Sequence, residues 1–511
     1  MKKFLALFLV VLLSVTCMAG CTTGSGESDE ASHLDVVLLL YMEGMDPAVK
    51  WNGWNLTRVG VGENLVRVNE NMEFEPQIAE SYEQIDELTY KFKIRKDIKF
   101  SNGNPVTPEA IKASIERSVA KNERGGSLKL DTIEIDGNDL IFKTTEPFSA
   151  FIANITEPMF SIIDTTVDEA LNATMPVSTG PYSITEYVSE ERIELAKNEF
   201  YWDGVPEIDT ITVKNINADV KVDAMLSDDV DVAQGPSATT LSKLDGNQEG
   251  IEIVQALGTR ENDMLLNTAE GSILADKNLR KALSYGLDRD VVADIAGNGY
   301  ASALNKPFPE SVGYGFDQVE GQEYNVDKAK AALKDAGYED KDGNGIVEKD
   351  GKELELSIVA SSKGSTGLIE VMQDMWKKIG INITIRMVEN VADVRSSGDY
   401  EILTSPGWQT VNAGDGQKYL TERWHSNGTD NDGKYNSPEF DAVMAELDGA
   451  FDTESRLKAF VKAQQILVED VPVIFTYAND NITLVDSKEV ENVTVFPIDY
   501  YLIRNDWKLV K

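Results

Sequence analysis

Residues 79–117 read AESYEQIDELTYKFKIRKDIKFSNGNPVTPEAIKASIER. Within this stretch, apolar and polar side chains alternate at residues 88–94 with a period of two, which predicts a half-buried strand. Residues 108–120 follow Thr107, a residue type that caps helices, and begin with Pro108, which suits the first helical position. One short stretch therefore predicts both a strand and a helix.

The same interleaving of strand-like and helix-like segments continues along the chain. Further strands are predicted at residues 34–41, 138–142, 208–213, 354–359, 381–388 and the apolar run 473–477. Further helices are predicted at residues 218–226, 277–287, 326–336, 368–379, 438–447 and 454–468. Such alternation over 511 residues favours an α/β architecture with more than one domain.

The N-terminus has the order of an export signal. A short basic start precedes an apolar run at residues 4–15, too short to span a bilayer comfortably, which takes about 20 apolar residues. The small residues that lead into Cys21 resemble a lipoprotein signal, in which that cysteine is acylated and becomes the first mature residue. We therefore expect a signal peptide at residues 1–20, a flexible tether at residues 21–33, and an anchor to the outer face of the cytoplasmic membrane through Cys21.

The composition excludes one large class of partner. The chain carries 87 acidic and 48 basic residues, a formal net charge of -39, whereas nucleic-acid phosphates require a basic surface. Hydrophobic residues make up 42% of the chain, which is ample for two or three cores. We therefore expect an acidic, soluble protein that binds no nucleic acid.

One acidic stretch, residues 340–351, imitates a calcium-binding loop. Oxygen-bearing side chains stand at Asp340, Asp342, Asn344 and Glu348, in the spacing of such a loop. The twelfth place, which needs a bidentate glutamate, is Gly351. We therefore expect an acidic surface turn and no bound calcium.

The usual catalytic motifs are missing from the sequence. No nucleophile elbow, zinc helix, phosphate loop or dinucleotide fingerprint occurs, and histidine is represented only by His33 and His425. Catalysis by carboxylates alone remains open, although nothing singles out a pair. The sequence favours a protein that captures a ligand and passes it on.

Residues 79–117 resemble the signature region of the peptide/nickel family of solute-binding proteins that serve ABC importers. Five further blocks match in the same order and extend the resemblance over nearly all of the chain after the tether: residues 178–187, 198–209, 267–289, 324–338 and 471–478. The resemblance implies a monomeric binding protein that needs no cofactor and delivers its ligand to the permease subunits of an importer.

The same resemblance implies a periplasmic-binding-protein-like type II fold, with two hinged α/β lobes and an inserted subdomain. Lobe I is expected at residues 34–66, 175–265 and 480–511, the inserted subdomain at 67–174, and lobe II at 266–479. A ligand bound in the cleft contacts both lobes only when they close, and so shifts the population towards the closed state.

Members of this family carry peptides, nickel or nickel chelates, haem and some sugars, so the cargo is inferred from single residues. Trp408 falls where the nickel-binding members have a pocket tryptophan, and His425, 17 positions later, falls close to their metal-coordinating histidine. Arg124 matches one of their pocket arginines, which pair with chelator carboxylates. A lone histidine in a polar loop, or an arginine at a helix end, is equally compatible with a surface role.

The sequence departs from those members at Glu157, which stands before Pro-x-Phe where they have a second cleft arginine. A carboxylate there repels a carboxylate-rich chelator but suits a peptide amino group or an aquated metal. Trp51 is a candidate for an aromatic cleft wall, or for the core, and Tyr41 lies where α/β sheets bind ligands, at the end of a strand.

The hypothesis drawn from these residues is capture of nickel, free or chelated. The alternative is an oligopeptide- or dipeptide-binding protein of the same family. An extracytoplasmic carboxylate-based hydrolase and a sensory binding protein are the remaining function classes.

Overall fold

The computed structural model describes residues 31–40, 43–244, 250–362, 366–404, 407–411 and 414–510. Residues Ser32–Lys511 form one compact unit. The expected signal peptide, the lipidation at Cys21 and the cleft candidate Tyr41 lie outside the described residues. In the part of the chain that is described, no helix is long and apolar enough to cross a membrane.

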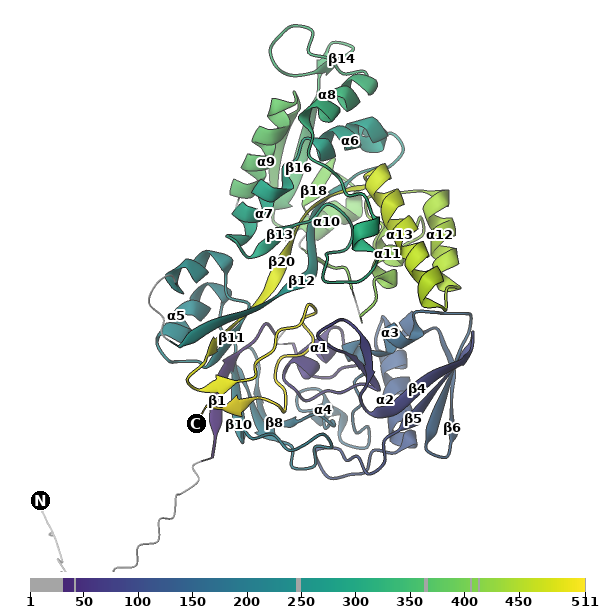
Figure 1. Cartoon of the computed structure of the whole chain (residues 1–511), viewed down its shortest axis with the longest axis vertical. Helices are drawn as coiled ribbons and strands as arrows, with labels where there is room; N and C mark the ends of the chain where they lie inside the picture. Colours follow the sequence, from purple (N-terminus) through teal and green to yellow (C-terminus); the bar gives the residue numbers. More distant parts are fainter. Residues whose placement is uncertain are drawn as a thin grey trace, which may run out of the picture. The chain divides into compact units, whose positions relative to one another are not determined.

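One large mixed sheet of twelve strands runs through the described part of the chain (Figure 1). Its central path is β17 (Asn382–Val388), β16 (Glu355–Ser361), β18 (Ile402–Thr404), β12 (Ile251–Leu266), β20 (Val473–Asp486), β11 (Val232–Gln234), β1 (His33–Val37), β10 (Thr210–Lys214), β9 (Arg192–Lys197) and β8 (Tyr182–Val188). Two short strands join this path at its middle, β13 (Ala301–Ala303) on β20 and β19 (Trp408–Gln409) on β12.

The antiparallel pair β12 and β20 forms the middle of the sheet. The two strands pair from Ile251 with Asp486 to Leu265 with Val473. Their register shifts between Leu257 and Glu261 and again between Asn262 and Asp263. Such irregularities bend a strand and re-aim its side chains, so they mark the place where β12 leaves regular pairing.

A second sheet forms a separate layer with a core of its own. Its four strands are ordered β4 (Ala79–Asp86), β5 (Thr89–Ile94), β7 (Asp139–Thr144) and β6 (Leu130–Asp136). Helix α2 (Pro108–Lys121) begins as predicted: the Thr107 side chain accepts a hydrogen bond from Ala110 N, and Pro108 occupies the first turn. Both elements predicted from residues 79–117 are therefore confirmed.

Two groups of helices pack against the upper part of the large sheet in Figure 1. Helices α6 (Lys277–Tyr285), α7 (Arg289–Gly297), α8 (Val326–Asp335) and α9 (Gly367–Lys378) share a core with β16, β17 and β18. Helices α11 (Gln417–Trp424), α12 (Pro438–Asp448) and α13 (Thr453–Asp470) share another core with β20. The predicted helices in these regions are confirmed to within a few residues.

Shorter elements complete the described chain. These are α1 (Asn52–Arg58), α3 (Phe151–Ile155), α4 (Glu169–Asn172), α5 (Lys221–Leu226), α10 (Val391–Ser397) and the strand pairs β2 (Val66–Val68) with β3 (Phe74–Pro76), β14 (Glu348–Lys349) with β15 (Lys352–Glu353), and β21 (Val490–Glu491) with β22 (Lys508–Leu509).

The predicted strand at residues 34–41 ends earlier than its apolar run. Strand β1 stops at Val37. Leu39 is exposed, and its carbonyl oxygen accepts a hydrogen bond from Arg58 Nη1 at 2.9 Å. The predicted end of the strand is wrong, because a run of apolar residues indicates burial and does not show where the hydrogen bonds to neighbouring strands stop. The predicted division into two lobes and an inserted subdomain stays a prediction.

In the calcium-like turn, residues 340–351, the aspartate side chains form hydrogen bonds with the backbone of the turn. Asp340 accepts hydrogen bonds from Gly343 N at 2.8 Å and from Gly345 N at 3.1 Å, and Asp342 accepts one from Asn344 N at 3.0 Å. Within the described residues, no group of three or more His, Cys, Asp or Glu side chains is arranged to hold a metal ion. The carboxylates of Asp340 and Asp342 thus serve the turn itself.

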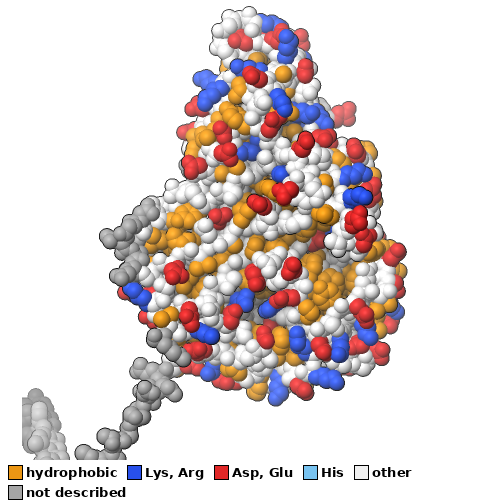
Figure 2. All heavy atoms as spheres, viewed as in Figure 1, with side chains coloured by type: hydrophobic (Ala, Val, Ile, Leu, Met, Phe, Trp, Pro, Cys, Tyr) orange, Lys and Arg blue, Asp and Glu red, His pale blue; other side chains and the backbone are white. Residues whose placement is uncertain are grey.

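The large charge excess is spread over the surface. On the face shown in Figure 2, acidic and basic side chains are interspersed among polar and apolar ones. With a formal net charge of -39 for the chain, this pattern favours solubility.

Trp376 tests the packing of the core around α9. Its side chain is fully buried, and its Nε1 donates to Leu283 O at 2.8 Å. Trp376→Ala is expected to lower the free energy of unfolding by about 3–5 kcal/mol, because a large cavity opens and a buried carbonyl loses its donor. Chemical denaturation measures this loss, with exposed Ile295→Ala on α7 as the control. Equal midpoints for the two variants would contradict the assignment.

Candidate functional site

A cavity of about 850 Å³ lies between α1, the loop after α2, β12, β19 and α11. Its wall combines aromatic, basic and acidic side chains from segments far apart in the sequence. The lining residues are Trp51, Trp54, Glu123, Arg124, Gly126, Ser127, Arg260, Gly407, Trp408, Gln409, Lys418, Glu422, Thr429 and Asp430. A concave site of this size with a few converging polar groups is typical of small-molecule binding.

Two tryptophans and an arginine form one side of the cavity. Trp51 and Trp54 stack with ring centroids 4.2 Å apart and planes at 21°. The Arg124 guanidinium lies 3.5 Å from the Trp51 ring centroid, and its Nη2 donates to Lys50 O at 3.1 Å. Stacking on an aromatic face fixes a guanidinium without neutralising its charge.

Trp408 forms the other aromatic side. The guanidinium of Arg423 lies 4.6 Å from its ring centroid. Arg423 is buried and pairs with Glu261 Oε1 at 2.7 Å and with Asp263 Oδ2 at 2.6 Å. Burial, followed by the charge of Asp263, raises the pKa of Glu261 well above its ordinary value. The Trp408 ring thus packs against Arg423, which is itself held in place by the buried carboxylates of Glu261 and Asp263.

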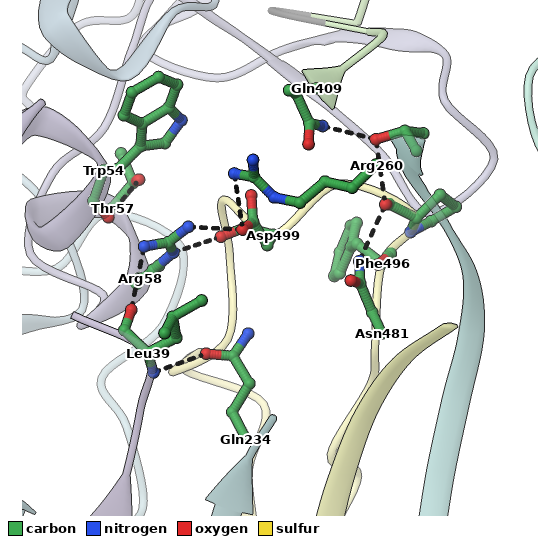
Figure 3. A network of polar contacts seen from close by, with 12 residues as sticks. Leu39, Trp54, Thr57, Arg58, Gln234, Arg260, Gln409, Asn481, Phe496 and Asp499 are labelled. Atoms are coloured by element: carbon green, nitrogen blue, oxygen red, sulfur yellow. Dashed lines mark hydrogen bonds and ion pairs between the residues drawn. The ribbon is translucent and has the colours of Figure 1, made fainter. Parts of the chain in front are cut away.

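Two arginines meet at one carboxylate beside the cavity (Figure 3). Arg58, fully buried, donates from Nη2 to Asp499 Oδ2 at 2.7 Å and from Nε to Asp499 O at 2.6 Å. Arg260, on β12, lines the cavity and donates from Nη2 to the same Oδ2 at 3.3 Å. Two guanidiniums on one carboxylate leave an excess positive charge on this side of the cavity.

The same arginines set the ionisation of Asp499. Burial by itself would raise the pKa of Asp499, but the charges of Arg58 and Arg260 outweigh it and hold the pKa below its ordinary value. Asp499 therefore stays ionised, and Arg260 is kept in place by a carboxylate that does not line the cavity.

Glu157 lies behind the cavity wall, next to its basic residues. It is 1% exposed and pairs with Lys418 Nζ at 2.8 Å and, more loosely, with Arg124 Nη1 at 3.5 Å. A small side pocket brings Glu157 together with Trp51, Trp54 and Arg124. The expected cation partner of Glu157 is therefore, in this structure, supplied by the protein's own Lys418 and Arg124.

Three carboxylates line the cavity itself: Glu123, Glu422 and Asp430. Burial raises the pKa of Glu422 and of Asp430, and the backbone N–H of Asp430 donates to Glu422 O at 2.9 Å. The cavity thus offers both basic and acidic partners, a combination that suits a ligand with groups of both signs.

Of the site residues predicted from the sequence, some line the cavity and others do not. Trp51, Arg124 and Trp408 line the cavity. His425, which follows α11, is not among the lining residues: its Nδ1 accepts from Asn427 N at 3.1 Å, and its Nε2 lies 3.7 Å from Asp441 Oδ1.

Sequence reasoning missed five charged residues of the lining: Glu123, Arg260, Lys418, Glu422 and Asp430. None belongs to a motif, and only the tertiary structure brings them together. The sequence holds one weak indication that Lys418 and Glu422 act together: they are four residues apart and therefore lie on one face of α11.

The ion pairs of Asp499 with Arg58 and Arg260 can be tested by how the stability of a variant depends on pH. Asp499→Asn is expected to lower the free energy of unfolding at pH 7 by about 3–5 kcal/mol, because Arg58 is left buried without its counter-charge. A lowered carboxyl pKa stabilises the fold above the unfolded-state value of about 4, and this contribution is lost as the pH falls through the lowered pKa.

The difference between wild type and Asp499→Asn should therefore narrow below about pH 4. Urea unfolding at several pH values measures it. Exposed Asp399→Asn, which removes a pair with Arg386, is the control and should change stability by at most about 0.5 kcal/mol. A difference for Asp499→Asn that is independent of pH would contradict the assignment.

Similar proteins of known role share this fold. A nickel-binding protein, NikA, from Staphylococcus aureus is 27% identical over 450 residues, which cover 87% of this chain and 88% of that protein. The oligopeptide-binding protein AppA from Bacillus subtilis is 26% identical and covers 82% of this chain and 80% of its own. The crystal structure of a nickel ABC transporter protein from Bacillus halodurans superposes with a TM-score of 0.78 at 29% identity, over 93% of this chain and 99% of that one.

The α/β fold is that of the type II periplasmic binding proteins. Residues 73–431 match the family of bacterial extracellular solute-binding proteins, family 5. That segment holds most of the residues that line the cavity. The chain therefore belongs to the family 5 extracellular solute-binding proteins, which serve ABC transporters and are not enzymes.

Proposed function

We propose that the protein captures a nickel chelate in the cavity and delivers it to the permease subunits of an ABC importer. The observation that carries the proposal is the set of three basic side chains, Arg124, Arg260 and Lys418, that line a cavity walled by tryptophans. Guanidinium groups pair with carboxylates through two parallel hydrogen bonds, the arrangement that a carboxylate-bearing chelator offers.

The acidic residues narrow the choice of chelator. Glu422 and Asp430 line the same cavity as the basic residues. A chelator with many uncompensated carboxylates is repelled by them, whereas an amino-acid chelator brings amino and carboxylate groups together. A nickel complex of histidine fits this pattern, because the metal offsets the chelator's negative charge.

The metal's own ligands come chiefly from the chelator in this proposal. His425 was expected to coordinate nickel, and that expectation stays a prediction. Its Nδ1 accepts a hydrogen bond from Asn427 N, and the residue is not among those that line the cavity. A chelator that fills the coordination shell by itself needs no ligand from His425.

A peptide is the alternative ligand. The opposed basic and acidic groups of the cavity also suit the two charged ends of a short peptide, and AppA is named as an oligopeptide-binding protein. The names of two similar proteins, a nickel-binding protein and a nickel ABC transporter protein, support nickel instead.

Membrane attachment through Cys21 forms part of the proposal. A lipid on Cys21 would hold the protein at the outer face of the cytoplasmic membrane, close to the importer. The protein acts there as a monomer that releases its ligand unchanged, in contrast to a hydrolase. A sensory role would use the same cavity without an importer.

The ligand is tested by calorimetric titration of the purified protein with nickel alone, histidine alone and nickel with histidine. Only the complex is expected to bind tightly. Arg124→Ala should weaken binding by about 10- to 100-fold, the loss that follows from removing hydrogen bonds to a charged group. Arg192→Ala on β9 is the control, since Arg192 pairs only with surface carboxylates.

His425→Ala is measured in the same titration and should leave the affinity within about threefold, a difference of less than 1 kcal/mol. Loss of binding in His425→Ala would instead make that ring a metal ligand. Tight binding of a peptide pool, with no response to the nickel complex, would contradict the proposed ligand.

The anchor is tested by Cys21→Ser. The wild-type protein is expected in the membrane fraction and the variant in the soluble fraction, because the variant cannot be acylated at that position. Immunoblotting of the two fractions measures the distribution. A variant that stays with the membrane to the same extent would exclude the Cys21 anchor.

A further inference from the structure

A second cavity lies beside the ligand cavity. It measures about 590 Å³, and its lining mixes aromatic side chains, among them Phe74, Tyr314 and Phe460, with charged and polar ones such as Asp415 and Arg456. We call it the outer cavity. Figure 2 shows hydrophobic side chains gathered on the surface at the level of α3, which contributes to the outer cavity.

Polar contacts join the segment around α3 to α11, α12 and α13. Lys418 Nζ, on α11, pairs with Glu157 Oε1 at 2.8 Å. Arg456 Nη1, on α13, donates to Ser149 Oγ at 2.6 Å, and Ser149 Oγ donates to Leu447 O at 2.8 Å. We call Ser149, Glu157, Lys418 and Arg456 the wall.

The Lys418–Glu157 pair of the wall joins two segments that each border both cavities. On α11 and the residues before it, Asp415 lines the outer cavity and Lys418, three residues later, lines the ligand cavity. On the segment around α3, Ala153 lines the outer cavity, and Glu157, four residues later, lies in the side pocket of the ligand cavity. Each segment therefore passes from one cavity to the other, and the wall contacts tie the segments together at the crossing.

The ion pair in the wall is shielded from water. The side chain of Lys418 is 11% exposed and that of Glu157 is 1% exposed. Separating the two leaves a buried carboxylate with only the looser contact to Arg124, at 3.5 Å, which makes the separation costly. A ligand that passes between these two segments, from one cavity into the other, has to break this pair.

We propose that the wall is a specificity determinant that ends the ligand cavity, so that compact ligands are accepted and extended peptides are excluded. The inference rests on the proposed function and adds the size limit of the ligand. Specificity of this kind comes from a cost imposed on the wrong ligand, not from extra contacts with the right one.

The test compares ligands of increasing length on the same protein. Histidine, His-Ala and His-Ala-Ala-Ala-Ala are titrated with and without nickel into wild type and into Glu157→Ala/Lys418→Ala, which removes both charges and leaves neither unpaired. The measured quantity is the ratio of the Kd for the longest ligand to the Kd for the shortest. Glu446→Ala/Lys462→Ala, which removes an exposed pair between α12 and α13, is the matched control.

Wild type and the control are expected to bind the longest ligand at least about tenfold more weakly than the shortest, a cost of about 1.4 kcal/mol. The double variant should lose most of that difference. If it fails to fold, Glu157→Gln/Lys418→Met takes its place, because these side chains remove the same ion pair and keep most of the side-chain volume.

An unchanged ratio in a folded wall variant, or a wild type that binds all lengths equally, overturns the wall as a size limit. Failure of the proposed ligand gives a different result. In that case nickel has no effect on any affinity, while the dependence on length is still measured with the peptides alone.

Discussion

The antiparallel pairing of β12 with β20 is the constraint on which the rest of the structure depends. The pair runs through the middle of the large sheet, and the register of β12 shifts at Glu261. Successive side chains on a strand point to opposite faces, so Arg260 reaches the cavity and Asp499 while Glu261 reaches the buried Arg423. Two neighbouring residues of one strand thus supply a basic residue of the cavity and the carboxylate that pairs with the arginine beneath Trp408.

Each basic residue near the cavity is fixed by a carboxylate buried behind it. Asp499 holds Arg260, and Glu157 holds Lys418 and, more loosely, Arg124. Desolvating such charges is costly, and the buried partners reduce that cost before any ligand arrives. Because these protein side chains are already ordered, they lose less conformational freedom when a ligand binds. The charge pattern inside the protein therefore decides which groups a ligand meets.

The sequence predicted local structure better than the site. The Thr107 cap, the following proline and the alternation at residues 88–94 are local signals, and the structure follows them at α2 and β5. The site depends on segments hundreds of residues apart, such as Glu157 and Lys418, whose pairing no local pattern contains. The sequence singles out Glu157 but not Lys418, which belongs to no motif. The spacing between Trp408 and His425 does not fix where the histidine ring points, and its role as a metal ligand stays a prediction.

The central claim is that a nickel chelate occupies the cavity between Trp51 and Trp408. X-ray diffraction from crystals grown with nickel and histidine, recorded at the nickel absorption edge, tests it most directly. The account predicts one anomalous peak inside this cavity, with chelator carboxylates on Arg124 or Arg260. An anomalous map without a peak there, or density for a peptide in its place, would contradict it.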